Sequence, residues 1–144
     1  MADAANVQVP MPRITELNRP YFDGLRAGRL MLQRCGRCDA VWFPPSPRCS
    51  QCLHDEPSWF EASGRGVVWS HIVMHRPYFA SFKDKIPYPI LMVRLDEGPM
   101  MISSLAEPTE EVACEDRVEL VIREVGPDVH LPYFRRTPAE QPAR

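Results

Sequence analysis

The sequence of 144 residues lacks any apolar run near the ~20 residues that a bilayer-spanning helix needs. Its first twelve residues also lack the basic start and the apolar stretch of a signal peptide. Basic residues are not in excess, because 17 Lys and Arg face 19 Asp and Glu for a formal net charge of -2. Nucleic-acid-binding surfaces are usually strongly basic. These absences predict a cytoplasmic protein that binds neither a membrane nor a nucleic acid.

Long helices are also excluded, because 16 prolines interrupt the chain, mainly in residues 10–20, 44–57 and 77–89. Proline removes a backbone donor and fixes φ, so these stretches favour turns, loops and strand edges. Hydrophobic residues still make up 44% of the sequence, enough for a folded core. We therefore expect a mainly β protein.

Five cysteines are present, and four of them form two Cys-x-x-Cys pairs separated by ten residues: Cys35, Cys38, Cys49 and Cys52. In a reducing compartment such pairs indicate a metal site rather than disulfides. Two pairs complete a tetrahedral set of four thiolates, which predicts one structural Zn²⁺ without an open position for catalysis. An iron site of the rubredoxin kind is the alternative. Its knuckles carry glycine after the second cysteine, where Asp39 and Leu53 stand here.

The remaining segments predict a short helix and a small all-β unit. Leu17, Tyr21 and Leu25 recur every fourth residue, and Gly28 is suited to end a helix over residues 15–27. β-rich runs follow at 30–34, 66–75, 90–95, 100–105, 117–124 and 129–134. The last five of these have the spacing of a small barrel or sandwich.

The loop between the first two of those five strands interleaves aromatic and basic residues. Its candidate binding residues are Arg76, Tyr78, Phe79, Phe82, Lys83, Lys85 and Tyr88. Such a mixture suits docking of a partner protein, because aromatic and arginine side chains dominate interface hot spots. Aromatics that fold back on the barrel, and a site for phosphates and a stacked base, are the alternatives.

No catalytic constellation is evident in the sequence. His71 and His75 share a strand face but lack an oriented partner and a nucleophile. Cys114 is the uncommitted cysteine, and we expect it to be buried as a small apolar residue. The chain is therefore predicted not to be an enzyme by itself.

Taken together, these segments resemble the DUF35 family of OB-fold proteins with a rubredoxin-like zinc ribbon. The resemblance lies in residues 21–25, 28–35, 42–45, 47–52, 63–68, 88–90, 93–98 and 131–134, and it spans about residues 15–136. It implies a flexible arm at 1–14, a helix with a zinc ribbon at 15–62, a five-stranded OB-fold barrel at 63–136 and a flexible tail at 137–144.

The family resemblance also implies a function. Members accompany thiolase-superfamily enzymes (thiolases, aldolases or acyltransferases that act on acyl-CoA) or hydratases of the MaoC kind. The chain is thus expected to be an accessory subunit in a hetero-oligomer, and to contact acyl-CoA itself in one version of this hypothesis. A nucleic-acid-binding protein and a stand-alone acyl-CoA binder are the alternatives.

Overall fold

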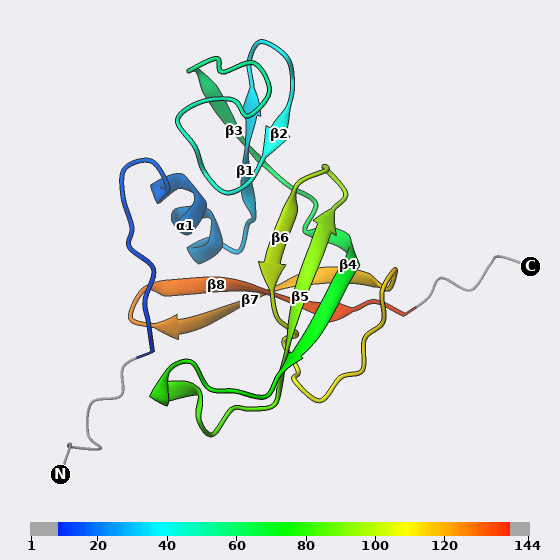
Figure 1. Cartoon of the computed structure of the whole chain (residues 1–144). Helices are drawn as coiled ribbons and strands as arrows, with labels where there is room; N and C mark the ends of the chain where they lie inside the picture. Colours follow the sequence, from blue (N-terminus) through cyan, green and yellow to red (C-terminus); the bar gives the residue numbers. More distant parts are fainter. Residues whose placement is uncertain (1–8, 139–144) are drawn as a thin grey trace, which may run out of the picture.

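The computed structural model describes residues 9–138 and shows a mainly β protein with one short helix (Figure 1). The elements of the N-terminal part are α1 (Arg19–Arg26), β1 (Met31–Cys35), β2 (Val41–Trp42) and β3 (Pro57–Glu61). The barrel contains β4 (Arg65–Met74), the 3₁₀ turn η1 (Ala80–Phe82), β5 (Tyr88–Leu95), β6 (Met100–Ser103), β7 (Arg117–Gly126) and β8 (Val129–Arg136). None of the described helices is long and apolar enough to cross a bilayer.

Helix α1 is shorter than the sequence pattern predicts. It begins after Asn18, whose side-chain oxygen accepts a hydrogen bond from the Thr15 backbone N–H at 2.7 Å. Leu17 therefore lies before the helix and is half-exposed instead of extending the apolar stripe. The predicted end is confirmed, because Gly28 has a φ of +80° that favours glycine.

The helix packs on the start of β1 because residue 24 is glycine. A Cβ atom at Gly24 would lie 2.4 Å from Cγ of Met31. The close approach buries Tyr21 and Leu25 in the same core as Leu32 of β1. That core continues into the barrel, whereas the cysteine end of the ribbon forms a second, smaller cluster of Cys35, Trp42 and Cys49.

The N-terminal sheet has the order β2-β1-β3, with both pairs antiparallel. Strand β3 was missed in the sequence, because Pro57 and Ser58 at its start weaken the strand pattern. It pairs with all of β1, from Met31 opposite Glu61 to Cys35 opposite Pro57. Ser46 donates its backbone N–H to the buried Gln33 side chain at 2.7 Å, which fastens the proline-rich loop to β1.

The second sheet has the order β6-β5-β4-β7-β8, and its five strands confirm the predicted OB-like barrel. A parallel bridge between Leu105 and Phe134 joins its two ends. Strands β4 and β5 approach closely at Gly66, where a Cβ atom would lie 2.5 Å from the Arg94 carbonyl oxygen. The register of β4 on β5 shifts between Val68 and Ser70, which marks a bulge at this point.

The termini of the described chain lie against the barrel. Cε of Met11 would be 2.7 Å from a Cβ atom on Gly126, so the segment 9–18 passes over the end of β7. The backbone N–H of Thr137 donates to the Arg117 carbonyl oxygen at 2.9 Å. The predicted arm and tail fall partly on residues 1–8 and 139–144, which lie outside the described residues. The predicted domain boundary at 62–63 falls in the connection between β3 and β4 and stays a prediction.

Candidate metal centre and neighbouring surfaces

Two turns with the same backbone hydrogen bonds carry the four cysteines. The N–H of Asp39 donates to the Cys35 carbonyl, and the N–H of Leu53 donates to the Cys49 carbonyl, both at 3.1 Å. Asp39 and Leu53 have positive φ values of 58° and 62°. The absence of glycine after each pair therefore does not change the knuckle geometry, because both residues adopt the left-handed backbone that glycine usually supplies.

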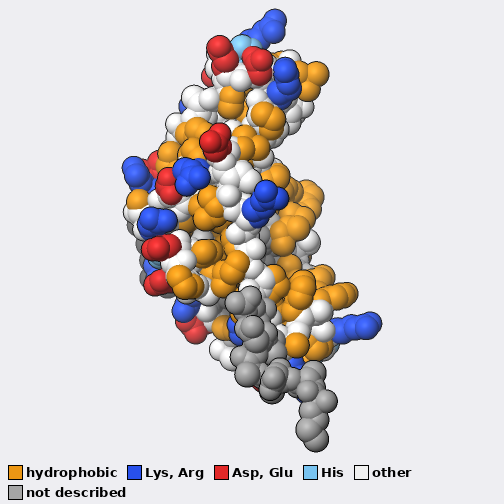
Figure 2. All heavy atoms as spheres, turned by 90° about the vertical axis from the view of Figure 1, so that its left-hand side faces the viewer, with side chains coloured by type: hydrophobic (Ala, Val, Ile, Leu, Met, Phe, Trp, Pro, Cys, Tyr) orange, Lys and Arg blue, Asp and Glu red, His pale blue; other side chains and the backbone are white. Residues whose placement is uncertain are grey.

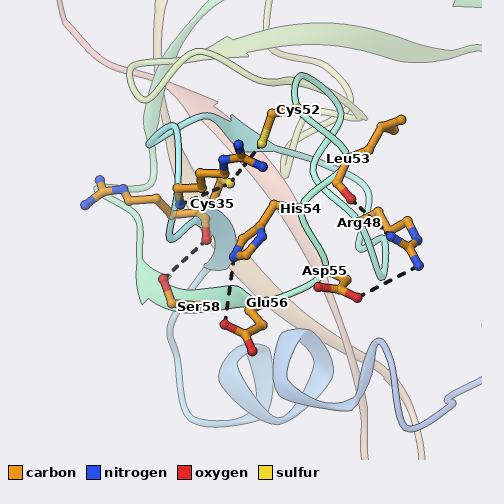
Figure 3. A network of polar contacts seen from close by, with 10 residues as sticks. Cys35, Arg48, Cys52, Leu53, His54, Asp55, Glu56 and Ser58 are labelled. Atoms are coloured by element: carbon orange, nitrogen blue, oxygen red, sulfur yellow. Dashed lines mark hydrogen bonds and ion pairs between the residues drawn. The ribbon is translucent and has the colours of Figure 1, made fainter.

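The four sulfur atoms converge on one point. The Sγ atoms of Cys35 and Cys52 lie 3.6 Å apart, as do those of Cys38 and Cys49. All four lie within 4.8 Å of one another. Zn–S bonds of ~2.3 Å in a tetrahedron place sulfur atoms about 3.8 Å apart, so the donor set fits one Zn²⁺. Figure 3 shows Cys35 and Cys52 pointing toward each other above β3.

Backbone donors prepare part of this site for ionised thiols. The N–H of Gln51 lies 3.3 Å from Sγ of Cys49, and the N–H of Cys52 lies 3.5 Å from it. Desolvation raises the pKa of Cys49, but these backbone hydrogen bonds, together with hydrogen bonds from the thiols of Cys38 and Cys35, outweigh it and lower that pKa to about 6. The neighbouring thiols together with burial raise the pKa of Cys38 to about 12, against the lowering effect of the Ala40 N–H. Four sulfurs this close ionise together only around a cation, which is the chemistry a divalent metal supplies.

The first cysteine of each pair is buried, and the second is more accessible. Cys35 and Cys49 are each 1% exposed and pack with Trp42, whereas Cys38 is exposed. A Zn²⁺ ion held by four protein ligands has no open position for substrate, and centres of this kind stabilise a fold rather than catalyse.

Two arginines and a histidine near the centre are engaged with other groups. The Arg34 guanidinium lies 4.3 Å over the Phe60 ring, and Arg48 donates to the Leu53 carbonyl at 3.2 Å. His54, a conceivable substitute ligand, faces Glu56 at 3.8 Å and is outside the sulfur cluster (Figure 3).

The predicted loop residues divide into two groups. Phe82 is the centre of one group: its ring lies 6.3 Å from Phe79, 5.7 Å from Tyr88 and 5.1 Å from Nζ of Lys85. The other group, Arg76, Tyr78 and Lys83, is exposed, with Tyr78 at 71%. The structure thus brings together four of the seven candidates. The expectation that Cys114 is buried is wrong, because it is exposed in the irregular segment before β7.

Sequence reasoning missed a groove between the barrel, α1 and the ribbon. It has a volume of about 500 Å³, and its lining includes Phe22, Phe43, Tyr88, Ile90 and Ile102. Burial raises the pKa of the neighbouring Tyr21, which keeps this phenol neutral. The available signal was the apolar run 90–93, whose consecutive residues place apolar side chains on both faces of one strand.

Four convergent cysteines on a ribbon and a five-stranded barrel define a zinc-ribbon and OB-fold protein. Two family models match along the chain. The model for the rubredoxin-like zinc ribbon domain of ChsH2 covers residues 22–58, and the model for the C-terminal OB-fold domain of ChsH2 covers residues 59–123. The chain belongs to the DUF35 family, and it carries one structural zinc ion. The predicted family and cofactor are thereby confirmed.

Curated relatives agree with this assignment. A DUF35 domain-containing scaffold protein of Pyrococcus furiosus is 31% identical over 62% of this chain and 68% of its own length. The probable enoyl-CoA hydratase alpha subunit of Thermomonospora curvata is 33% identical over 88% of this chain. The chain spans only 39% of the length of that hydratase subunit.

Solved structures show the same fold. One chain of a structure described as the Ltp2-ChsH2(DUF35) aldolase is 32% identical and superposes with a TM-score of 0.77, covering 88% of this chain and 98% of that one. A DUF35 protein of unknown function from Sulfolobus solfataricus, 14% identical with a TM-score of 0.58 over 74% of this chain and 78% of its own, shares the fold alone.

Proposed function

We propose that this chain is a non-catalytic partner subunit of an enzyme that acts on acyl-CoA. The observation that carries this proposal is the match over 98% of one chain in the Ltp2-ChsH2(DUF35) aldolase, at 32% identity. The scaffold name of the archaeal relatives and the hydratase name of the actinobacterial relative support the same class of role. The partner belongs to the thiolase superfamily, as a thiolase, aldolase or acyltransferase, or else to the MaoC-type hydratases.

The chemistry of the described residues is consistent with a non-catalytic role. The metal has four protein ligands, which we assign as Cys35, Cys38, Cys49 and Cys52, and a closed shell of this kind holds structure. The remaining cysteine, Cys114, is exposed, and no hydrogen bond recorded among residues 9–138 joins it to a histidine. An acyl-transferring thiol needs a base within hydrogen-bond reach, so the reacting groups belong to the partner. Five unpaired cysteines also support a reducing, cytoplasmic location.

The test is purification of the tagged full chain from its native host, followed by size-exclusion chromatography and mass spectrometry. A stoichiometric acyl-CoA enzyme in the same peak is the expected result. Its turnover should require this chain, and Cys114→Ala should leave the turnover of the complex unchanged. Elution of the chain alone, or with nucleic acid that nuclease removes, would contradict the proposal.

A second candidate function is direct contact with acyl-CoA. A hollow of about 450 Å³ adjoins Phe82 and Tyr88, and its lining also includes Lys85 and Arg123. Aromatic rings beside Lys85 suit an adenine and a phosphate, while Arg123 pairs with Glu107 and Asp84 also lines the hollow. Calorimetry with acetyl-CoA should then give binding that Lys85→Glu weakens, whereas Arg76→Glu, outside this hollow, should leave it unchanged. Equal heats for all three proteins, or no heat at all, would place the nucleotide on the partner.

A further inference from the structure

Three neighbouring barrel strands carry apolar side chains on their outer side. The register pairs Ile72 of β4 with Ile90 of β5, and Met92 of β5 with Ile102 of β6. The alternate positions of β5, such as Leu91 and Val93, are fully buried in the core, so the pleat turns these four residues outward. The apolar face comprises Trp69, Ile72, Ile90, Met92, Met100 and Ile102.

This apolar face is open to solvent to an unusual degree. Ile102 is 67% exposed, Ile72 is 57% exposed and Trp69 is 49% exposed. Single exposed apolar residues are ordinary, but a contiguous group on one sheet face marks an interaction surface. In a view from the left-hand side of Figure 1, hydrophobic side chains lie across the centre and along the right, and charges of both signs lie at the left (Figure 2).

The groove continues from the apolar face. Ile90 and Ile102 belong to both, and the groove runs from them to Phe22 of α1 and Phe43 of the ribbon. An open sheet face beside a hollow of about 500 Å³ suits a folded protein that lays one surface on the strands and inserts a protruding side chain.

The charges at the edge of the face indicate the kind of partner. The loop after β4 contributes Arg76, Lys83 and Lys85 against one acid, Asp84, and Arg94 stacks over Trp69 at 4.9 Å. The chain as a whole has a net charge of -2, so this excess of cations is local. A second copy of the chain would bring like charges together, whereas a surface bordered by carboxylates would be attracted.

We propose that the apolar face is the docking surface for the acyl-CoA enzyme, which presents apolar side chains bordered by carboxylates. This inference rests on the proposed function, because that function supplies the partner. The groove receives a side chain of the enzyme, and the cations of the loop pair with its acidic border.

The test uses the co-purified enzyme, identified by its sequence, and the full-length chain loaded with zinc. Ile102→Asp should weaken the measured affinity for that enzyme by about tenfold or more. Leu53→Asp is the matched control, since Leu53 is also 67% exposed and lies in the second cysteine turn of the ribbon, where it takes the position and the positive φ that Asp39 has in the first turn. A Lys83→Glu, Lys85→Glu double variant should slow association several-fold at low salt, and less at high salt.

Each outcome decides the question. Loss of affinity in Ile102→Asp with an unchanged Leu53→Asp and an unchanged melting temperature supports the inference. Equal affinity of Ile102→Asp and the wild type overturns the docking surface and leaves the proposed function standing. Absence of any acyl-CoA enzyme overturns both. Dimerisation of the purified chain, or sedimentation with phosphatidylserine vesicles, that Ile102→Asp abolishes would show that the face serves another occupant and overturn the inference.

Discussion

The two outer faces of the barrel differ in how they meet water. On the β7–β8 side, Arg135 pairs with Glu119 directly across the two strands, and Arg123 pairs with Glu107 at 2.7 Å. On the β4–β5–β6 side, most outward positions hold isoleucine, methionine or tryptophan, with Ser70 and Arg94 among them. Both faces belong to the same sheet and cover the same core.

The difference teaches that the exposed apolar side chains are not required by the barrel. On the β7–β8 side, charged pairs such as Glu119 with Arg135 share the outward positions with apolar residues such as Val121, which is only partly exposed. Surface ion pairs add little stability and keep a face soluble, whereas exposed isoleucine gains its favourable free energy only when another surface covers it. The apolar face is therefore best explained by binding.

Removing the metal should have the largest effect on stability. It should unfold the ribbon, beside the apolar face, before the barrel. In Cys49→Ser one of four ligands is lost, and the binding of zinc is coupled to folding. We expect the melting temperature to fall by roughly 10 °C or more, together with a loss of bound zinc measured by atomic absorption. Cys114→Ser is the matched control and should change neither quantity. An unchanged melting temperature after zinc removal would contradict a structural role for the metal.

Substitution of one glycine on each side of the barrel tests how closely the chain packs there. Gly66→Ala should destabilise the protein by ~1–3 kcal/mol, because its Cβ atom would meet the backbone oxygen of Arg94 under the apolar face. Gly126→Ala, on β7, should cost much less, because its Cβ atom would meet only the flexible end of Met11. Urea denaturation of both variants measures the contrast. Equal losses would show that the β4–β5 approach is not tight.

The sequence predicts the strands well where one face is buried and the other is polar, as in β7. There Val118 is buried, and Glu119 and Arg123 point outward. It fails at β3, which begins with proline and is held mainly by its pairing with β1. It also fails at Leu17, whose helical spacing is overridden by the start of α1 at Arg19. Strand pairing and helix capping determine the structure at these two places, and the periodicity of the sequence carries no information about either.

The cluster of four cysteines was predictable, because its members are close in the sequence and their chemistry is specific. The apolar face was not, because its residues come from three strands, and only the register brings Ile72, Ile90 and Ile102 into neighbouring positions. The exposure of Cys114 was likewise outside the reach of composition, since it depends on the path of the segment before β7.

A smaller effect is expected from the ion pair at the edge of the β7–β8 side. Hydrogen bonds from Arg117 at 2.8 Å lower the pKa of Asp96 from its ordinary value of 3.8, against the opposing effect of desolvation. Because the folded-state pKa is lowered, this stabilisation is present above about pH 4 and is lost as the pH falls toward the folded-state value. Both side chains are more than a third exposed, so Asp96→Asn should cost ~0.2–1 kcal/mol at pH 7 and less at high salt. Denaturation at pH 7 and pH 3 should show that the gap between wild type and variant closes in acid; a constant gap would contradict the role of the charge.

The smallest effect on stability is expected at the apolar face itself. Ile102→Thr keeps a β-branched side chain on an edge strand, and Ile102 is 67% exposed, so the free energy of unfolding should change by less than ~0.5 kcal/mol. Retention on a hydrophobic column should nevertheless fall, because one of the most exposed apolar side chains is removed. Val121→Thr on β7, which is less exposed, is the comparison and should change retention less. A large loss of stability in Ile102→Thr would mean that the face is needed for folding, and the contrast between the two sides of the barrel would then no longer point to a partner.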